Sequence, residues 1–491
     1  MAFEVKSIDF QTKKVVGTSE FATTGLISFP QDKPLKKVLN ISAYVSSVSG
    51  EVIDTDYNFQ GKANLSVLYL SEDNKTERLL TEIQFQHGVH AVAEEEFVQV
   101  NVVECHIEES DAVYAKVSVL MLAEVVGKVN GSLSVLSGEE ENYVTDKANT
   151  THTAYVSGSK TNFELSGTVE TDKASTVLFA DTVVDIKNVV AGLDQVTVSG
   201  EARTKIGYLL EGELTEETKV IEFSRELSVD GVNPESLVSV VVTAEETTFA
   251  SETDEKTKAN YSVAIGALVS AYANKTESIM RDIFSTNREV EVTYGCSNYL
   301  KYQGSDSFKE NITENAEIDA QDGVVLTSCY AKIAKFEILN KKVCAEGVIF
   351  ATAIYKNQEE LCSKQISVPF LINHLTTLQG NANLNSVQVE GLNVTKGTTE
   401  NAQVSFNLIF NFSTETEQYV EYVEAIKDLG ESRQVPSAIT IYVAKPNDTL
   451  FSVARSLRVL PEQILSQNQV VDGKFEAGQR IFVYSPLVAE F

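Results

Sequence analysis

Histidine and cysteine are the most reactive side chains of this chain, which has five of each. His87 and His90 lie three residues apart, in a segment with the pattern of a strand or turn and without a third ligand close by. A zinc site needs three or four ligands, so this pair is too small to predict one. Cys105 and His106 are neighbours on an alternating strand, where adjacent side chains point to opposite faces. We therefore expect no metal site and no bound cofactor.

Motifs that position a nucleophile or hold a phosphate do not occur where they would function. There is no such GxSxG elbow, P-loop, GxGxxG turn or HExxH helix. Acidic pairs are common, but a chain with 70 aspartates and glutamates forms them without any catalytic requirement. No segment resembles a hydrolase domain. The sequence therefore predicts a protein that acts by binding and is not an enzyme.

Two arginines stand out against an acidic background. The net charge is −30 and the pI is about 4.6, a field that repels nucleic acid and anionic membranes. Nearly all of this charge precedes residue 436, because four basic residues roughly balance the acids that follow: Arg455, Arg458, Lys474 and Arg480. Arg455 and Arg458 share a face of a predicted helix. That face either binds an acidic partner protein or is simply exposed to solvent.

Length and composition indicate the elements that must position these residues. A chain of 491 residues is long enough for three or four domains. Abundant Val, Thr, Ser and Tyr with only 8 prolines favour β structure. The first residues carry charges at Glu4, Lys6 and Asp9 in place of an apolar signal segment, and no stretch approaches 18 consecutive apolar residues. With scattered cysteines and no CxxC, this predicts a reduced, cytoplasmic setting.

A sequence repeat fills the first 430 residues. In three places a glycine is followed eight residues later by a tyrosine, and after 15 or 16 more by a phenylalanine. The three sets are Gly61, Tyr69 and Phe85; Gly200, Tyr208 and Phe223; and Gly347, Tyr355 and Phe370. Residues alternate sides in these stretches as in strands with one buried face, and the glycine indicates a bulge or a close approach of two backbones. The pattern predicts a β unit that occurs three times.

Each unit is expected to end in a long strand pair, namely 98–107 with 113–126, 237–247 with 259–272, and 384–394 with 402–412. Two further segments favour helices. A short helix is expected at 276–285. The segment 417–429 places five residues on one helical face, with Gly430 positioned to end the helix: Tyr419, Val420, Val423, Ile426 and Leu429. This second helix would pack on its own sheet or connect the repeats to the C-terminal module.

The last fifty or so residues predict a small βααβ module. Strands are expected at 439–443 and 482–483, with Gly478 in the turn before the second. Asp448 sits where a helix N-cap belongs. Apolar residues follow it at helical spacing: Leu450, Val453, Ala454 and Leu457. Pro461 opens a second helix at a position where its missing N–H costs nothing, and Ile464 and Leu465 form the buried face of that helix.

This order of elements resembles a LysM module, a fold usually associated with N-acetylated glycans of cell walls. In LysM modules sugar binds in a shallow groove between the loop before the first helix and the loop after the second. The resemblance implies a groove formed by Asn447, Asp448, Thr449, Leu450, Asn468, Gln469, Val470 and Val471. Asn447 stands where glycine is usual and adds a side chain at the lip of the groove. Capping and turn stabilisation are the alternative roles of Asp448 and Asn468.

The repeats resemble the SPOCS domain of spore-forming Firmicutes. The matching pieces are the glycine–tyrosine strands and the segments 29–39 and 280–292, although the second and third units lack a clear counterpart of the proline-containing entry segment. Such repeats followed by one LysM module look like the architecture of the SipL-like spore-morphogenesis family. That resemblance implies a mother-cell protein at the forespore surface. Its LysM module would dock on the coat's morphogenetic ATPase, SpoIVA.

The sequence as a whole predicts a mostly β protein of three β-sandwich-like repeats, at 1–140, 141–290 and 291–430, and a LysM module at 436–486. The expected function is a non-enzymatic scaffold in spore-envelope assembly, with the LysM module as docking element. One alternative is a peptidoglycan-binding protein of the cell wall or spore cortex. Another is a self-assembling filament or surface-layer subunit, whose unpaired β edges join one copy to the next.

Overall fold

The structure is a computed structural model that describes residues 3–91, 94–170, 176–251, 258–318, 323–357, 360–396, 401–432, 439–469 and 475–484. Over these residues the chain forms twenty strands and two helices. Strands dominate everywhere except in the last module, which has the order strand, helix, helix, strand. The predicted fold class, mostly β in repeated units with a C-terminal βααβ module, is confirmed.

Three units of six strands precede the C-terminal module. The first unit contains β1 (Glu4–Ser28), β2 (Leu35–Ile53), β3 (Asp56–Ser71), β4 (Thr76–His90), β5 (Glu94–Ser110) and β6 (Tyr114–Ser137). The second contains β7 (Tyr143–Glu170), β8 (Thr176–Ala191), β9 (Gln195–Leu210), β10 (Glu213–Ser228), β11 (Leu237–Ser251) and β12 (Lys258–Ser285). The third contains β13 (Arg288–Glu317), β14 (Val325–Leu339), β15 (Lys342–Asn357), β16 (Glu360–Leu375), β17 (Asn381–Lys396) and β18 (Asn401–Glu431). The C-terminal module contains β19 (Ile439–Val443), α1 (Leu450–Leu457), α2 (Pro461–Gln467) and β20 (Arg480–Tyr484).

Each unit is a sandwich of two three-stranded antiparallel sheets. The sheet orders are β1-β6-β5 with β2-β3-β4, β11-β12-β7 with β10-β9-β8, and β13-β18-β17 with β14-β15-β16. The first strand of every unit therefore pairs with the last strand of the same unit. Inward-facing apolar side chains from both sheets fill one core per unit, as alternation along half-buried strands requires.

The glycine and phenylalanine that recur in the sequence are cross-strand partners. The pairs are Gly61 with Phe85, Gly200 with Phe223, and Gly347 with Phe370. In each pair the phenylalanine ring lies over the glycine, and a Cβ atom added there would be only 2.6–3.0 Å from the ring Cζ atom. The glycine thus provides the space that the ring fills. This close approach explains why the two residue types recur together.

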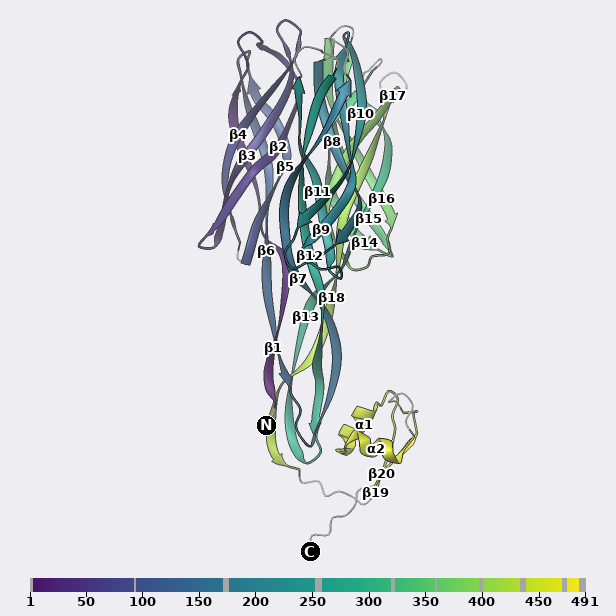
Figure 1. Cartoon of the computed structure of the whole chain (residues 1–491). Helices are drawn as coiled ribbons and strands as arrows, with labels where there is room; N and C mark the ends of the chain where they lie inside the picture. Colours follow the sequence, from purple (N-terminus) through teal and green to yellow (C-terminus); the bar gives the residue numbers. More distant parts are fainter. Residues whose placement is uncertain are drawn as a thin grey trace.

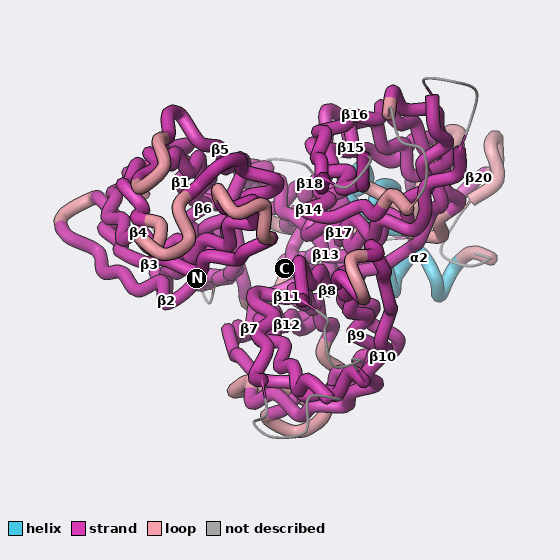
Figure 2. Tube along the Cα trace, turned by 90° about the horizontal axis from the view of Figure 1, so that it is seen from above, coloured by secondary structure: helices cyan, strands magenta, loops and turns pink. Residues whose placement is uncertain are grey.

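The three sandwiches surround a common axis (Figure 2). At the end of the sandwiches farthest from the stalk, one apolar cluster contains side chains from all three units. Its buried members are Leu39, Leu68 and Leu70 of the first unit, Leu178 and Phe179 of the second, and Val325, Ile354 and Leu361 of the third. The units therefore share a core in addition to their own, which holds them as one body.

A chain of hydrogen bonds also links the three units. The Asn40 side-chain amide donates to Ser328 Oγ at 2.8 Å, and the Ser328 backbone N–H donates to Asp181 Oδ2 at 3.0 Å. These residues belong to the first, third and second unit. Burial raises the pKa of the Asp181 carboxyl above its usual range.

The first and last strands of each unit continue beyond the sandwiches and form a stalk (Figure 1). The stalk therefore consists of three two-stranded ribbons, β1 with β6, β7 with β12, and β13 with β18. Two apolar clusters fill its interior with residues of all three units. The first contains Ile8, Leu133, Val135, Ile279, Val420 and Tyr422, and the second contains Leu136, Met280, Ile283 and Val423.

A β-bulge marks the boundary between sandwich and stalk in the first strand of every unit. The extra residue is Val16 in β1, Val156 in β7 and Gln303 in β13. A bulge bends a strand and increases its twist. The three bulges therefore redirect the ribbons from the separate sandwiches into the common stalk.

The helix predicted at 276–285 is wrong, because these residues belong to β12 and lie in the stalk. β12 has a bulge at Arg281, opposite the Lys147–Asp146 step of β7. The extra residue places Met280 and Ile283 in the same cluster although they are three positions apart. Spacing by three is typical of a helix, so the bulge produced a misleading pattern.

The helix predicted at 417–429 is wrong for the same reason. These residues lie in β18, whose register against β13 shifts between Thr293 and Tyr294 and leaves Glu424 as the extra residue. Val423 and Ile426 consequently pack in the same cluster. The segment is neither a helix nor a connector, but a stalk strand with a bulge.

Candidate functional site

The C-terminal module is a two-stranded antiparallel sheet with two helices against it. β19 pairs with β20 from Ile439 opposite Tyr484 to Val443 opposite Arg480. Its buried core consists of Ala444, Val453, Ala454, Ile464, Phe475, Ile481 and Val483. Pro461 occupies the start of α2, as the sequence predicts. Figure 1 places the module beside the far end of the stalk.

The loop before α1 carries half of the predicted groove. Asn447 has a left-handed backbone with φ 70° and an exposed side chain. The residue that caps α1 is Thr449 and not Asp448, so that prediction is wrong: Thr449 Oγ1 accepts from the Ser452 N–H at 3.2 Å, and Ser452 Oγ accepts from the Thr449 N–H. Leu450, the first residue of α1, is half-buried and packs against the module's core.

Asp448 stabilises the loop itself. Its carboxylate accepts from the Lys445 backbone N–H at 2.7 Å and from the Tyr442 hydroxyl at 2.9 Å. Burial, and next the hydrogen bond to Asp448, raise the pKa of Tyr442. Asp448 therefore ties the loop to β19 and stabilises the fold, one residue before Thr449, which caps the helix.

The loop after α2 carries the other half of the groove. Asn468 connects this loop to β20: its amide donates to the carbonyls of Ile464 at 3.0 Å and Phe482 at 2.7 Å, and its Oδ1 accepts from the Phe482 N–H at 2.8 Å. The carbonyl of Gln469 accepts from the Gln479 side chain at 2.9 Å, and the Gln469 side chain is exposed. The last two predicted groove residues, Val470 and Val471, lie outside the described residues.

Substituting Asn468 should therefore weaken the fold of the module. Asn468→Ala removes three hydrogen bonds and leaves backbone groups of β20 and α2 without partners, so we expect a loss of about 2 kcal/mol. Thermal unfolding of the module measures the change. Gln469→Ala is the control, because this exposed side chain should contribute little. Wild-type stability of Asn468→Ala would contradict the structural role.

The two arginines of the predicted basic face contact the stalk of the same chain. Arg455 forms an ion pair with Asp282 of β12, and its guanidinium also donates to the Tyr294 hydroxyl at 3.3 Å. Arg458 donates to Ser432 Oγ at 2.6 Å and lies 3.8 Å from Glu289. The acidic surface that this face meets in the structure is thus intramolecular.

Sequence reasoning missed the stalk residues that receive the module. Phe284 at the end of β12 belongs to the module's apolar cluster, with Phe451 at 5.4 Å between ring centroids. The signal was present in the segment 280–285, where the acidic Asp282 and the aromatic Phe284 accompany two apolar residues, Met280 and Ile283. Its misleading helical spacing hid the fact that it forms the end of a strand.

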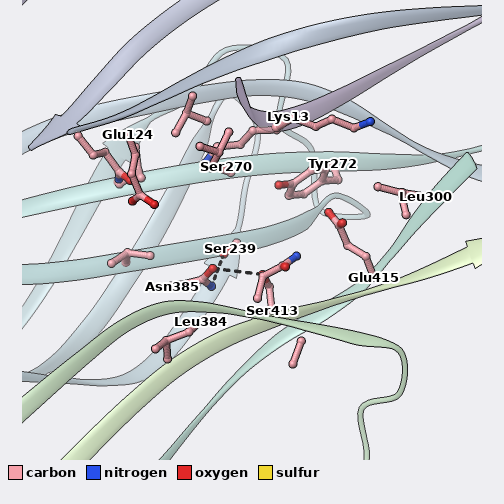
Figure 3. A pocket seen from close by; sticks show the side chains of 18 of the residues that line it. Lys13, Glu124, Ser239, Ser270, Tyr272, Leu300, Leu384, Asn385, Ser413 and Glu415 are labelled. Carbon is pink, nitrogen blue, oxygen red and sulfur yellow. Dashed lines mark hydrogen bonds between the residues drawn. The ribbon is translucent and has the colours of Figure 1, made fainter. Parts of the chain in front are cut away.

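A cavity lies where the three units meet (Figure 3). This cavity has a volume of about 580 Å³ and is lined mainly by polar residues from all three units. Ser413 Oγ donates to Asn385 Oδ1 at 3.2 Å, and the Asn385 amide donates to Ser239 Oγ at 3.4 Å. Burial raises the pKa of the Glu415 carboxyl that faces the same space. The hydrogen bonds and charges on its walls suit water or a small polar solute.

Lys13 makes this junction sensitive to pH. Its ammonium donates to Ser270 Oγ at 2.7 Å, and burial lowers its pKa to about 8. Lysine in an unfolded chain titrates near 10.4, so between these values the unfolded state binds more protons and stability rises with pH. Lys13→Met should therefore be more stable than wild type at pH 7, with an advantage that shrinks from about pH 8 to 10.5. Unfolding temperatures across this range test the prediction, with exposed Lys14→Met as control.

The histidines singled out in the sequence make separate contacts. His87 stacks on Phe21 with 4.2 Å between ring centroids and is hydrogen-bonded to Ser19 at 2.8 Å. His90 pairs with Asp56 at 3.1 Å. Among the described residues no group of three or more His, Cys, Asp or Glu could hold a metal ion. None of the five cysteines forms a disulfide. In the part of the chain that the structure describes, no helix has the length and apolar character to cross a membrane.

Comparison with known proteins identifies the C-terminal module. The family model of the LysM domain matches residues 442–483, which include the end of β19, both helices and most of β20. The match does not extend to the three β units. No curated protein and no solved structure matches the chain. The module is therefore a LysM domain, a domain type that suggests binding of peptidoglycan or a related carbohydrate.

Proposed function

We propose that this protein is a non-enzymatic scaffold that holds a glycan-binding LysM domain at the end of its stalk. The observation that carries the proposal is the orientation of the domain. α1 turns Phe451, Arg455 and Arg458 toward the stalk. Asn447 before α1 and Gln469 after α2 stay exposed. The Gln469 amide can donate to and accept from the hydroxyl and acetamido groups of a sugar chain, whereas the Asn447 side chain stands at the lip of the groove.

The stalk also supports this function electrostatically. The three units carry nearly all of the net charge of −30, which an anionic cell wall would repel. From Glu4 to the bulge at Val16 the stalk strand β1 has a length of about 40 Å, at about 3.3 Å per residue. Salt screens charges beyond about 8 Å under physiological conditions. A LysM domain at the stalk's far end can therefore reach a wall while the acidic sandwiches remain several screening lengths away.

Titration of the full chain with a hexamer of N-acetylglucosamine tests the proposal. We expect saturable binding by calorimetry, and we expect Asn447→Gly to bind several-fold more tightly because it clears the lip of the groove and suits the left-handed backbone. Asn74→Gly is a matched control, since Asn74 has a similar φ of 59° in a turn of the first unit. Absence of saturable binding at millimolar sugar for both wild type and Asn447→Gly would refute the proposal.

A more specific role in spore-envelope assembly is the second candidate. Its supporting observation is that the arginine face of α1 binds an acidic, aromatic protein surface, here that of the stalk. The resemblance of the repeats to SPOCS domains points to a mother-cell protein at the forespore surface, with a SpoIVA-like coat ATPase as partner. Co-sedimentation with that purified ATPase tests this role. Arg455→Glu with Arg458→Glu should abolish capture, and capture unchanged by both substitutions would contradict it.

A further inference from the structure

Helix α1 presents three distinct faces. Leu450, Val453, Ala454 and Leu457 recur at helical spacing and pack in the core of the LysM domain. Phe451 and Arg455 lie at positions i and i+4 on a second face, and Arg458 follows them in a row as the C-cap residue, with a left-handed backbone. Ser452 and Ser456 occupy the remaining side. This row of side chains therefore contacts a surface outside the LysM domain.

Each side chain of this row contacts a partner at the end of the stalk. Phe451 meets Phe284 edge to face, Arg455 meets Asp282 and Tyr294, and Arg458 meets Glu289 and Ser432. The stalk residues come from β12, from β13 and from Ser432 directly after β18, so the second and third units together form the surface. The Tyr294 hydroxyl donates to Asp282 Oδ1 at 2.7 Å, which orients the carboxylate toward the arginine.

The burial of Phe284 is the strongest evidence that the LysM domain covers this surface of the stalk. Phe284 is only 4 % exposed, and its apolar neighbours belong mainly to the LysM domain. Removing the domain would expose a large aromatic ring at the end of the stalk. Ion pairs at such exposed positions contribute little to the free energy of the contact. The aromatic contact therefore supplies most of the attraction, and the arginines determine how the domain is oriented on the stalk.

We infer that the stalk end is a docking surface for α1 of the LysM domain, and that the protein rests in a closed state in which this contact hides Arg455 and Arg458. Asn447 and Gln469, the exposed residues of the described parts of the groove loops, lie outside the contacts that hold α1 on the stalk. Glycan can therefore bind to the closed state, whereas an acidic protein that needs the two arginines has to displace the stalk first. The inference does not depend on glycan binding, and its test uses no sugar.

Fluorescence can report the closed state because the chain has no tryptophan. In full-length Phe284→Trp the new indole replaces a buried ring and should emit as a buried tryptophan. Arg455→Glu or Asp282→Arg alone should shift the emission to that of an exposed indole. The double charge swap Arg455→Glu with Asp282→Arg should shift it back. Glu462→Arg reverses a charge on α2, away from the contact, and should leave the emission unchanged.

Small-angle X-ray scattering of chains that keep Phe284 gives an independent measurement. Arg455→Glu should increase the radius of gyration relative to wild type, and the charge swap should restore it. High salt should reduce the increase that Arg455→Glu causes, because it screens the repulsion between the new glutamate and Asp282. The inference is overturned if both single reversals leave the emission and the radius unchanged, or if the charge swap fails to restore either.

Discussion

Alanine at Gly200 or Gly347 is expected to destabilise the unit that contains it by about 3 kcal/mol, the upper end of the cost of overpacking a core. At Gly200 the new Cβ atom would lie 2.4 Å from the Asp185 carbonyl oxygen, and at Gly347 it would lie 2.4 Å from that of Lys332. Both carbonyls belong to the neighbouring strand, which has a bulge next to the glycine. Two backbones must therefore separate to admit one methyl group.

Gly61 provides a matched contrast. The three atoms nearest its added Cβ all belong to the Phe85 ring, with Cζ at 2.6 Å, and none of them is a backbone atom. Phe85→Leu removes that ring, so it should recover much of the stability lost in Gly61→Ala. The equivalent change Phe223→Leu should not rescue Gly200→Ala, because the carbonyl of Asp185 remains in place.

Urea unfolding of each single and double variant measures these differences. The midpoint of the transition that contains the altered unit is the relevant quantity, since a chain of several units need not unfold in one step. Equal rescue at Gly61 and Gly200 would show that the phenylalanine ring, and not the bulged backbone, sets the requirement for glycine.

These glycines also show how much of the fold was predictable from the sequence. Their spacing to tyrosine and phenylalanine predicted a repeated strand with a bulge or a close approach of backbones. The structure has a close approach of backbones at Gly200 and Gly347, whereas at Gly61 the nearest atoms belong to the Phe85 ring. The reason is local: a cross-strand pair leaves a periodic trace in the sequence. The βααβ order of the LysM domain was predictable for a similar reason, because Pro461 and Gly478 mark element ends directly.

The arrangement of the three units around one stalk produces no periodic pattern in the sequence from which it could be predicted. Its contacts join residues hundreds of positions apart, such as Lys6 of the first unit and Glu277 of the second. The bulges at Arg281 and Glu424 moreover shifted the alternation that identifies a strand, and produced helical spacing in its place. The docking of α1 on Asp282 and Phe284 was hidden for the same reason, because half of the contact surface was assigned to a helix.

A charge in the middle of the stalk should reduce stability still more than the glycine substitutions do. Val423 is fully buried in the cluster that contains Leu136, Met280 and Ile283, with side chains from all three units. Val423→Asp places a carboxylate there without a partner. Burying an unpaired charge is among the most destabilising changes known for proteins, so we expect a cost of about 4–5 kcal/mol.

The expected result is loss of the stalk and retention of the sandwiches. Each sandwich has its own core and a shared cluster at the opposite end, neither of which contains Val423. Hydrogen exchange should therefore show protection lost along the stalk strands and kept in the sandwiches. Leu429→Asp is the matched control, because Leu429 lies on the same strand and is 54 % exposed.

The same variant separates the stalk from the docking surface that it carries. Asp282, Glu289 and Tyr294 belong to strands that the stalk core holds together, so Val423→Asp should also release α1 of the LysM domain. In the Phe284→Trp background, adding Val423→Asp should shift the tryptophan emission as far as adding Arg455→Glu does. This shift is expected although Val423 is not a residue of the contact. The charge swap should no longer restore the closed state, because the surface itself is lost. Protection of the stalk strands at the wild-type level in Val423→Asp would show that the two-stranded ribbons hold together without their shared core.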